Sequence, residues 1–391
     1  MLLMTFRAVC NCTTSAVQMP DVANVLRFRP RVTSASLSRE DVDLRADEFL
    51  ASELYDSESE VDRTLGVDGD VLTAVCKRLG DVLNEDPRAV GEKAPRLYRY
   101  LCAKSSRDFF FDERDFFLGE SALLAAGASR LLGKKEETEL WLDRADANFR
   151  HTVSPSPQLA RVAYIRLTLR YQTRRHEEVL ELLPSVTLTF EKLGMENDEA
   201  KCRFLEAMSL KELGRVEESS TKLERLAFSR RERVDQSLYG MALVNLGDLR
   251  SEKGCFDSAL AAYKEAMPLL QAANRHYALA DLKVMVGGTL RKMGQLTQAL
   301  GAYRDAVQDH VNLGMATRVA YLRILFAEVL LEAGKVREAE WEILAALPTI
   351  DQEQMVPEGF AAAALLRESV RQRNPDSNAL FELREYLQAS N

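Results

Sequence analysis

The sequence contains few of the residues that interrupt helices. Its 391 residues include only 11 prolines and 19 glycines, while 46% are hydrophobic and 29% are charged. No apolar run approaches the roughly 20 residues that a membrane-spanning helix needs. The opening MLLMTFRAVCNC is short and is interrupted by Arg7, which disfavours a signal peptide. This composition is typical of an all-α protein, and we expect a cytoplasmic one that does not associate with a membrane.

Residue patterns that carry catalytic or metal chemistry are also missing. The six cysteines follow no disulfide framework, so we expect reduced thiols. The Cys10–Cys12 pair lacks the two further ligands that a metal site needs, and the four histidines are scattered along the chain. The sequence has no phosphate-binding P-loop and no nucleophile elbow. We therefore expect no cofactor, no metal and no enzymatic activity.

The charge is low overall and uneven at the N-terminal end. A formal net charge of −8 gives the main body no electrostatic footprint for nucleic acid. Residues 1–38 have no periodic apolar face, and we expect a disordered tail, or an over-called start with Met19 as the true one. Its removal is predicted to leave thermal stability nearly unchanged. Residues 39–65, rich in acids, are predicted to form an acidic linker or a short helix.

A ladder of small and large residues repeats along the chain at a constant step. Ala299 stands five residues after Gly294, and Tyr303 and Ala306 stand nine and twelve residues after it. The same spacing follows Gly254 and Gly334, and weaker versions follow Gly133, Arg174, Gly214 and Asn374. Steps of three and four place each ladder on one helix face, and glycine readily ends a helix in a left-handed cap. We predict a tight turn at each glycine and buried alanines at Ala259, Ala299 and Ala339.

A second marker stands seven residues before each turn position. It reads Ala126, Leu167, Ala207, Gly247, Gly287 and Ala327, and all but Leu167 are small. Small residues allow a second helix to approach closely, so each unit is predicted to be two antiparallel helices that meet there. A repeat at a fixed period is the sequence signature of a solenoid.

These residues resemble the tetratricopeptide repeat (TPR). The closest match is Leu243–Ala266, which includes the Asn245-Leu246-Gly247 run. The usual repeat is about 34 residues long, so the 40-residue step from Gly254 to Gly294 implies two lengthened helices, as in the kinesin light chain and Rap-type regulators. HEAT and armadillo repeats, at about 40–47 residues, are the second choice because they lack this ladder. The resemblance implies an all-α, right-handed α-solenoid.

The resemblance also divides the chain. Residues 66–107 are predicted to form a degenerate N-terminal capping hairpin, and residues 108–391 to form the TPR-like array with a C-terminal capping helix. Five phenylalanines between Asp108 and Phe117 stand at the junction. We favour buried packing for them over an exposed patch that binds a partner.

In the TPR family, the first helix of each pair lines a concave groove. Carried over by position, the partner-binding groove residues are Arg161, Tyr164, Lys201, Phe204, Met208, Asp248, Arg291 and Tyr321. The mix of aromatics and cations favours a partner protein or peptide with acidic groups, and charge reversal at Arg161 with Lys201 is predicted to weaken binding without unfolding. The alternative for the larger apolar members is packing between repeats. The carboxylate clamp of some chaperone-binding arrays is not expected, because Phe204, Val244 and Val284 stand where it needs polar residues.

The sequence thus predicts a non-enzymatic scaffold or adaptor that binds a partner protein or peptide in the groove of a TPR array. The alternative is a peptide-sensing regulatory protein, or an accessory subunit that controls a protease or transcription factor. Such regulators usually carry an N-terminal output module. Asp70–Lys104 is the candidate segment, and it shows no helix-turn-helix pattern.

Overall fold

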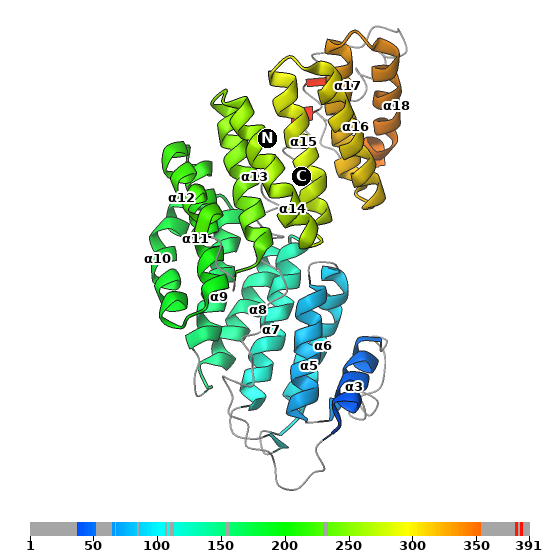
Figure 1. Ribbon diagram of the computed structural model, residues 1–391. Helices are drawn as coiled ribbons and strands as arrows, with labels where there is room; N and C mark the ends of the chain where they lie inside the picture. The colour runs from blue at the N-terminus through cyan, green and yellow to red at the C-terminus, as the bar shows by residue number, and fades with distance from the viewer. Residues whose placement is uncertain are drawn as a thin grey trace. The chain divides into compact units, whose positions relative to one another are not determined.

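The structure is a computed structural model that describes residues 37–51, 65–66, 68–83, 86–105, 108–109, 113–152, 156–229, 234–352, 380–381 and 384–385. Within these ranges the regular structure is helical and contains no strand (Figure 1). The chain divides into two compact units, which we call the N-terminal unit, ending at Leu213, and the C-terminal unit, beginning at Gly214. Residues 1–36 of the predicted tail, with the Cys10–Cys12 pair, lie outside the described residues. Ser38, from the end of the predicted tail, is described, and its Oγ accepts a hydrogen bond from the Asp41 backbone N–H.

The helices of the N-terminal unit are α3 (Arg39–Ala51), α5 (Gly69–Val82), α6 (Pro87–Ala103), α7 (Glu113–Leu131), α8 (Lys135–Phe149), α9 (Ser156–Gln172), α10 (His176–Lys192) and α11 (Glu196–Glu212). Those of the C-terminal unit are α12 (Val216–Ser229), α13 (Gln236–Glu252), α14 (Phe256–Ala272), α15 (His276–Lys292), α16 (Leu296–Asn312), α17 (Ala316–Glu332) and α18 (Val336–Gln352). Leu380, Phe381, Arg384 and Glu385 are also helical.

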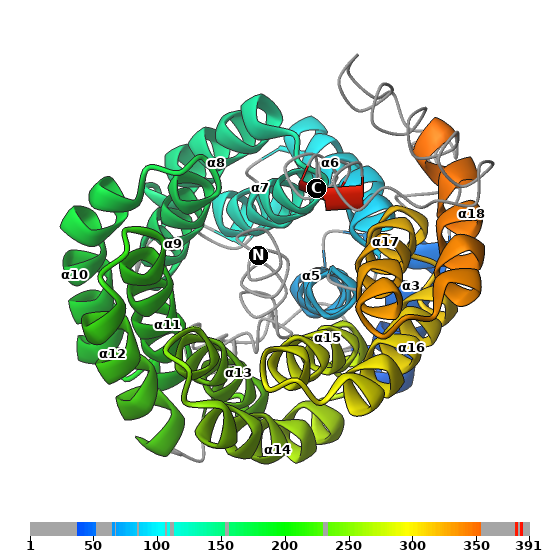
Figure 2. The same cartoon turned by 90° about the horizontal axis from the view of Figure 1, so that it is seen from above.

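Sequential helices pack side by side and form two rows within each unit. In the C-terminal unit α13, α15 and α17 make one row and α14, α16 and α18 the other; in the N-terminal unit α9 and α11 face α8 and α10 in the same way (Figure 2). We call α7, α9, α11, α13, α15 and α17 the first helices, because each opens a predicted pair. The predicted all-α solenoid of antiparallel helix pairs is confirmed.

Left-handed residues end the helices at a constant spacing. Gly254, Gly294 and Gly334 have φ angles of 80°, 75° and 72°, so the predicted tight turns are confirmed. A second set of left-handed residues, Gly194, Asn274 and Gly314, stands midway between turn positions and was not predicted. Because the two sets alternate, the helices that they separate are nearly uniform in length. Helices α9, α10, α11 and α13 to α18 each have 17 residues.

The ladder residues form the contact between the two helices of a pair. Ala259, Ala299 and Ala339 have no exposed surface, as predicted, and the large residues Tyr263, Tyr303 and Ile343 are buried with them. Burial of apolar surface is favourable by about 25 cal/mol per Å², so this contact stabilises the hairpin. The small residues seven positions before the turns, such as Gly247 and Gly287, leave room for the large residues Tyr263 and Tyr303 of the second helix.

The region before the clear repeats is also helical. Asp68 and Asp86 cap α5 and α6 through side-chain bonds to backbone N–H groups, and Pro87 opens α6 where no N–H is needed. Of the five phenylalanines at the junction, Phe109, Phe116 and Phe117 are buried and Phe110 and Phe111 lie outside the described residues. The division into capping hairpin and array remains a prediction. None of the described helices is long and apolar enough to cross a membrane.

Candidate functional site

The eight predicted groove residues all lie on first helices. Arg161 and Tyr164 are on α9, Lys201, Phe204 and Met208 on α11, Asp248 on α13, Arg291 on α15 and Tyr321 on α17. Their side chains are less exposed than residues that line an open groove should be. Phe204 and Met208 are 1% and 0% exposed, which supports the alternative that these two side chains pack between helices. Tyr164, Asp248 and Tyr321 are buried too, whereas the Arg291 side chain keeps a quarter of its surface exposed.

Arg161 pairs with an acid that the sequence analysis did not single out. Its Nη1 lies 3.8 Å from Oε1 of Glu120 on α7, and the two side chains are only 8% and 5% exposed. Among the described residues, Arg161 Nη2 and Glu120 Oε1 have no hydrogen-bond partner. Burial raises the pKa of Glu120, and Arg161 opposes that rise. Glu120 stands as far before the turn at Gly133 as Arg161 stands before Arg174, so the same positional rule could have found it.

Lys201 is paired in the same way. Its Nζ donates to Oδ1 of Asp198 at 3.0 Å, one turn earlier on α11, and the Lys201 side chain is 5% exposed. Burial alone would raise the pKa of Asp198, but Lys201 and Arg161 more than offset it and the pKa is lowered. We call Glu120, Arg161, Asp198 and Lys201 the charged cluster of the N-terminal unit.

The charged cluster corrects two expectations. Its two cations are matched by two acids, so it gives no preference for an acidic ligand. Reversing both charges would place four acidic side chains together in a nearly buried site. Removing one partner of a buried ion pair typically costs about 3–5 kcal/mol. The premise that Arg161 and Lys201 are exposed is therefore wrong, and we expect the double reversal to destabilise the fold.

A buried polar network in the C-terminal unit joins three consecutive helices. Oδ1 of Asp281 on α15 accepts a hydrogen bond from Arg318 on α17 at 2.8 Å and lies 3.2 Å from Nε2 of His310 on α16. The other ring nitrogen of His310 lies 2.8 Å from the Ala306 carbonyl oxygen. Both ring nitrogens therefore face acceptors. This network holds the register of adjacent helices on the first-helix side of the unit.

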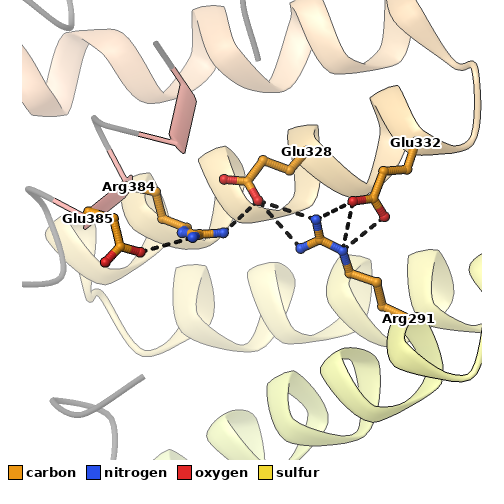
Figure 3. A network of polar contacts seen from close by, with 5 residues as sticks. All are labelled: Arg291, Glu328, Glu332, Arg384 and Glu385. Atoms are coloured by element: carbon orange, nitrogen blue, oxygen red, sulfur yellow. Dashed lines mark hydrogen bonds and ion pairs between the residues drawn. The ribbon is translucent and has the colours of Figure 1, made fainter. Parts of the chain in front are cut away.

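Arg291, the most exposed of the predicted residues, belongs to a second network (Figure 3). Its guanidinium binds Glu332 through Nε, which donates to Oε2 at 2.9 Å, and through Nη2. Nη1 of Arg291 also lies 3.4 Å from Oε2 of Glu328. Both acids are on α17, so the network ties α15 to the next first helix.

Glu328 has a stronger partner from further along the chain. Nη1 of Arg384 donates to Glu328 Oε2 at 2.6 Å (Figure 3). Burial raises the pKa of Glu328, and Arg384 and Arg291 oppose that rise. Glu328 stands six residues before Gly334, at a position the family resemblance assigns to the groove, whereas no sequence pattern pointed to Arg384.

The described residues offer little for metal chemistry. Across the described ranges, no group of three or more His, Cys, Asp or Glu side chains could hold a metal ion. The geometry instead provides buried, paired charges along the first helices. Such pairs can bind polar groups of a ligand, but they do not bring a nucleophile and a base together.

Comparison with known proteins identifies the fold. No family model matches the sequence, and no curated protein matches it either. Among solved structures, a Rap protein complexed with competence and sporulation factor has a TM-score of 0.53 at 11% identity over 88% of this chain and 99% of that one. NprR in complex with its cognate peptide NprX has a TM-score of 0.51 at 15% identity, over 89% of this chain and 98% of that one.

A third similar structure names the repeat. The signal transduction ATPase with a tetratricopeptide repeat sensor from Pyrococcus horikoshii has a TM-score of 0.53 at 13% identity, over 90% of this chain and 62% of that one. At these identities the likeness speaks for the fold, which is a TPR-like helical solenoid.

Proposed function

We propose that this protein is a non-enzymatic scaffold that binds a segment of a partner protein or a peptide along its first helices. The observation that carries the proposal is that, within each unit, consecutive first helices carry nearly buried charged side chains. These helices form the row that the TPR resemblance assigns to the ligand. NprR, which shares the fold, is seen with its cognate peptide NprX, and a Rap protein of the same fold is seen with competence and sporulation factor. The 40-residue TPR type and a cytoplasmic location are part of the same proposal.

The proposed contact residues are the polar members of the predicted set. Arg161 and Lys201 represent the N-terminal unit, and Asp248, Arg291 and Tyr321 the C-terminal unit. Tyr164 is the second aromatic residue of the proposed contact set, with Tyr321. Phe204 and Met208 are not proposed as contact residues. Neither side chain reaches solvent, so we propose that they pack behind the surface.

A second candidate function is peptide sensing that controls a regulator. The NprR–peptide complex favours it. The Asp281 network also favours it, because it links three helices and would transmit a shift of α15 to α17. The two candidates share the binding step and differ in whether binding changes the arrangement of the helices.

A random-sequence peptide library displayed on phage tests the binding step. Peptides selected on the full chain are synthesised, and their affinities are measured against the wild type, Arg291→Gln and Arg337→Gln. Arg291 lies on the proposed surface, whereas Arg337 is exposed on the second helix α18. We expect some peptides to lose at least tenfold in affinity with Arg291→Gln and none to respond to Arg337→Gln.

The opposite result is equally clear. If no peptide is selected, or if all selected peptides bind Arg291→Gln and a Tyr321→Ala variant as tightly as the wild type, the first helices of the C-terminal unit are not the ligand surface. Helical circular dichroism of each variant confirms that a lost affinity is not a lost fold.

A further inference from the structure

Arg384 contacts the first-helix surface in the way a ligand would. It comes from a part of the chain 56 residues beyond Glu328, and its Nη1 donates to Glu328 Oε2 at 2.6 Å. Glu328 stands at a predicted groove position, and its side chain is 11% exposed. Arg291 shares the same oxygen, but its closer contacts are with Glu332. Arg384 is therefore the main partner of the Glu328 carboxylate.

The contact between Arg384 and Glu328 joins only one N–H group of the guanidinium to one oxygen of the carboxylate. Nη2 of Arg384 is taken by its chain neighbour Glu385, at 2.9 Å from Oε1 (Figure 3). Glu328 Oε1 is buried and has no hydrogen-bond partner in the described part of the chain. An arginine and a carboxylate bind most strongly when two parallel N–H groups meet both oxygens. The single contact leaves one carboxylate oxygen available to a better-placed donor.

An apolar residue one helical turn earlier anchors the same segment. Leu380 has no exposed surface and belongs to the core cluster that contains Tyr321 and Val284. Leu380 and Arg384 are both helical and stand four positions apart, which is the spacing of neighbours on one helix face. Phe381 is more than half exposed, and its ring lies against the Arg384 guanidinium at 4.8 Å. Among the four described residues of the segment, Leu380 contributes an apolar contact and Arg384 a monodentate ion pair.

We propose that the chain's own C-terminal segment is a removable occupant of the first-helix surface, with Leu380 and Arg384 holding the place of a partner's apolar and cationic side chains. The partner for this end of the surface is then a segment that carries arginine one helical turn from an aliphatic residue. Its arginine gains both oxygens of Glu328, which offsets the loss of Arg384. Naming the partner rests on the proposed function, whereas the internal occupancy does not.

A competition experiment without any foreign partner tests the occupancy. The probe is a fluorescent synthetic peptide of residues 376–391, and the proteins are the full chain in wild-type form and with Arg384→Glu. In the wild type the internal segment competes at an effective concentration on the order of 1 mM. In the Arg384→Glu protein the internal segment keeps Leu380 but loses its ion pair with Glu328, so it competes less. We expect this protein to bind the peptide at least tenfold more tightly.

Three matched controls assign the binding to Glu328. Arg337→Glu, which reverses an exposed arginine on α18, is expected to bind the peptide no better than the wild type. Adding Glu328→Gln to Arg384→Glu is expected to remove the gain. A peptide with Arg384→Glu is expected not to bind. Equal binding by the wild type and Arg384→Glu, or a gain that survives Glu328→Gln, overturns the proposal.

Hydrogen exchange of the wild-type chain tests independently whether the C-terminal segment leaves the first-helix surface. This test also holds if the Arg384→Glu variant fails to fold. A removable occupant opens without unfolding its neighbours, so the amides of Leu380, Phe381, Arg384 and Glu385 are expected to exchange at least 100-fold faster than those of α17. If both exchange at the same rate, the segment is a permanent cap and the proposal is wrong. Either result leaves the binding proposal for the other first helices standing.

Discussion

Gly247 of α13 lies against the ring of Tyr263 of α14, so closely that a Cβ atom on the glycine would sit 2.4 Å from the ring's Cε1. The equivalent pair one repeat later, Gly287 and Tyr303, leaves 3.1 Å. These pairs explain the two sequence markers together: the small residue before the turn makes room for the large residue after it. The closest approach between the helices of a pair is therefore set by one missing side chain.

Replacing Gly247 with alanine should destabilise the protein. The new methyl group meets the ring of a buried tyrosine that has no room to move, and overpacking of this kind costs about 1–3 kcal/mol. Gly287→Ala should cost less, because its contact is longer. Urea denaturation measures both free energies of unfolding.

Gly301→Ala is the matched control for these two variants. Gly301 is also helical, but a Cβ there meets nothing within 4 Å. Alanine is the better helix former, so this variant should gain about 0.5–1 kcal/mol. A Gly247→Ala variant that is as stable as Gly301→Ala would contradict the close approach.

Ala299→Leu should also lower the free energy of unfolding. Ala299 has no exposed surface and faces the first helix of its pair, so the three added carbon atoms have no space and should cost about 1–3 kcal/mol. The neighbouring Gln298 is exposed, and Gln298→Leu serves as the control with nearly unchanged stability. A denaturation midpoint equal to that of the wild type would show that the site can expand.

Arg174→Gly should stabilise the protein. Arg174 occupies a turn position with a φ of 60°, where a residue with a Cβ is strained by roughly 1–2 kcal/mol. Glycine removes most of that strain, and we expect a net gain of about 1 kcal/mol in the free energy of unfolding. Arg174→Ala keeps the strained backbone without the arginine side chain and should show no gain. Equal melting temperatures for the glycine and alanine variants would contradict the prediction.

Stability should fall with acid partly through Asp281. Burial would raise its pKa, but Arg318 and His310 more than offset this and lower it. A carboxylate with a lowered folded-state pKa stabilises the protein above its unfolded pKa of about 3.9. That stabilisation is lost as the pH falls through the folded-state pKa.

Asp281→Asn tests this assignment. The variant should be less stable than the wild type at pH 7, because Arg318 loses its acidic partner. The difference should shrink as the pH falls below the unfolded pKa of about 3.9, because Asp281 is then protonated in the unfolded wild-type chain before it is protonated in the folded one. The exposed Asp305, converted to asparagine, serves as the control. A gap between wild type and Asp281→Asn that stays constant from pH 7 to pH 3 would refute the role of the ion pair.

The repeat could be predicted from sequence because two positions in each clear repeat restrict the residue type. Gly254 must be left-handed and Ala259 must be small, and both requirements leave a visible pattern. The second set of turns left none, since Asn274 and Gly314 are followed by helices with no equal ladder. Turn geometry alone does not fix the residues that follow it.

The ion pairs of the candidate site were harder to predict. The positional rule found Arg161 but not its partner Glu120, because the rule was not extended to the turn at Gly133. Arg384 lies outside the first helices, and its contact with Glu328 spans 56 residues. A pair so distant leaves no periodic signal in a single sequence. The sequence therefore indicated on which helices the predicted groove residues lie and missed how their charges are balanced.

The regular turn spacing restricts how this chain can change length. Each helix with its turn reverses the direction of the chain and moves it to the other row. Losing one helix with its turn would put every later second helix in a first-helix position, with its buried face on the wrong side. Losing or gaining a whole helix pair keeps every later helix in its row. Length variants of this protein should therefore differ by whole helix pairs. The number of repeats can then vary while every helix stays in its own row.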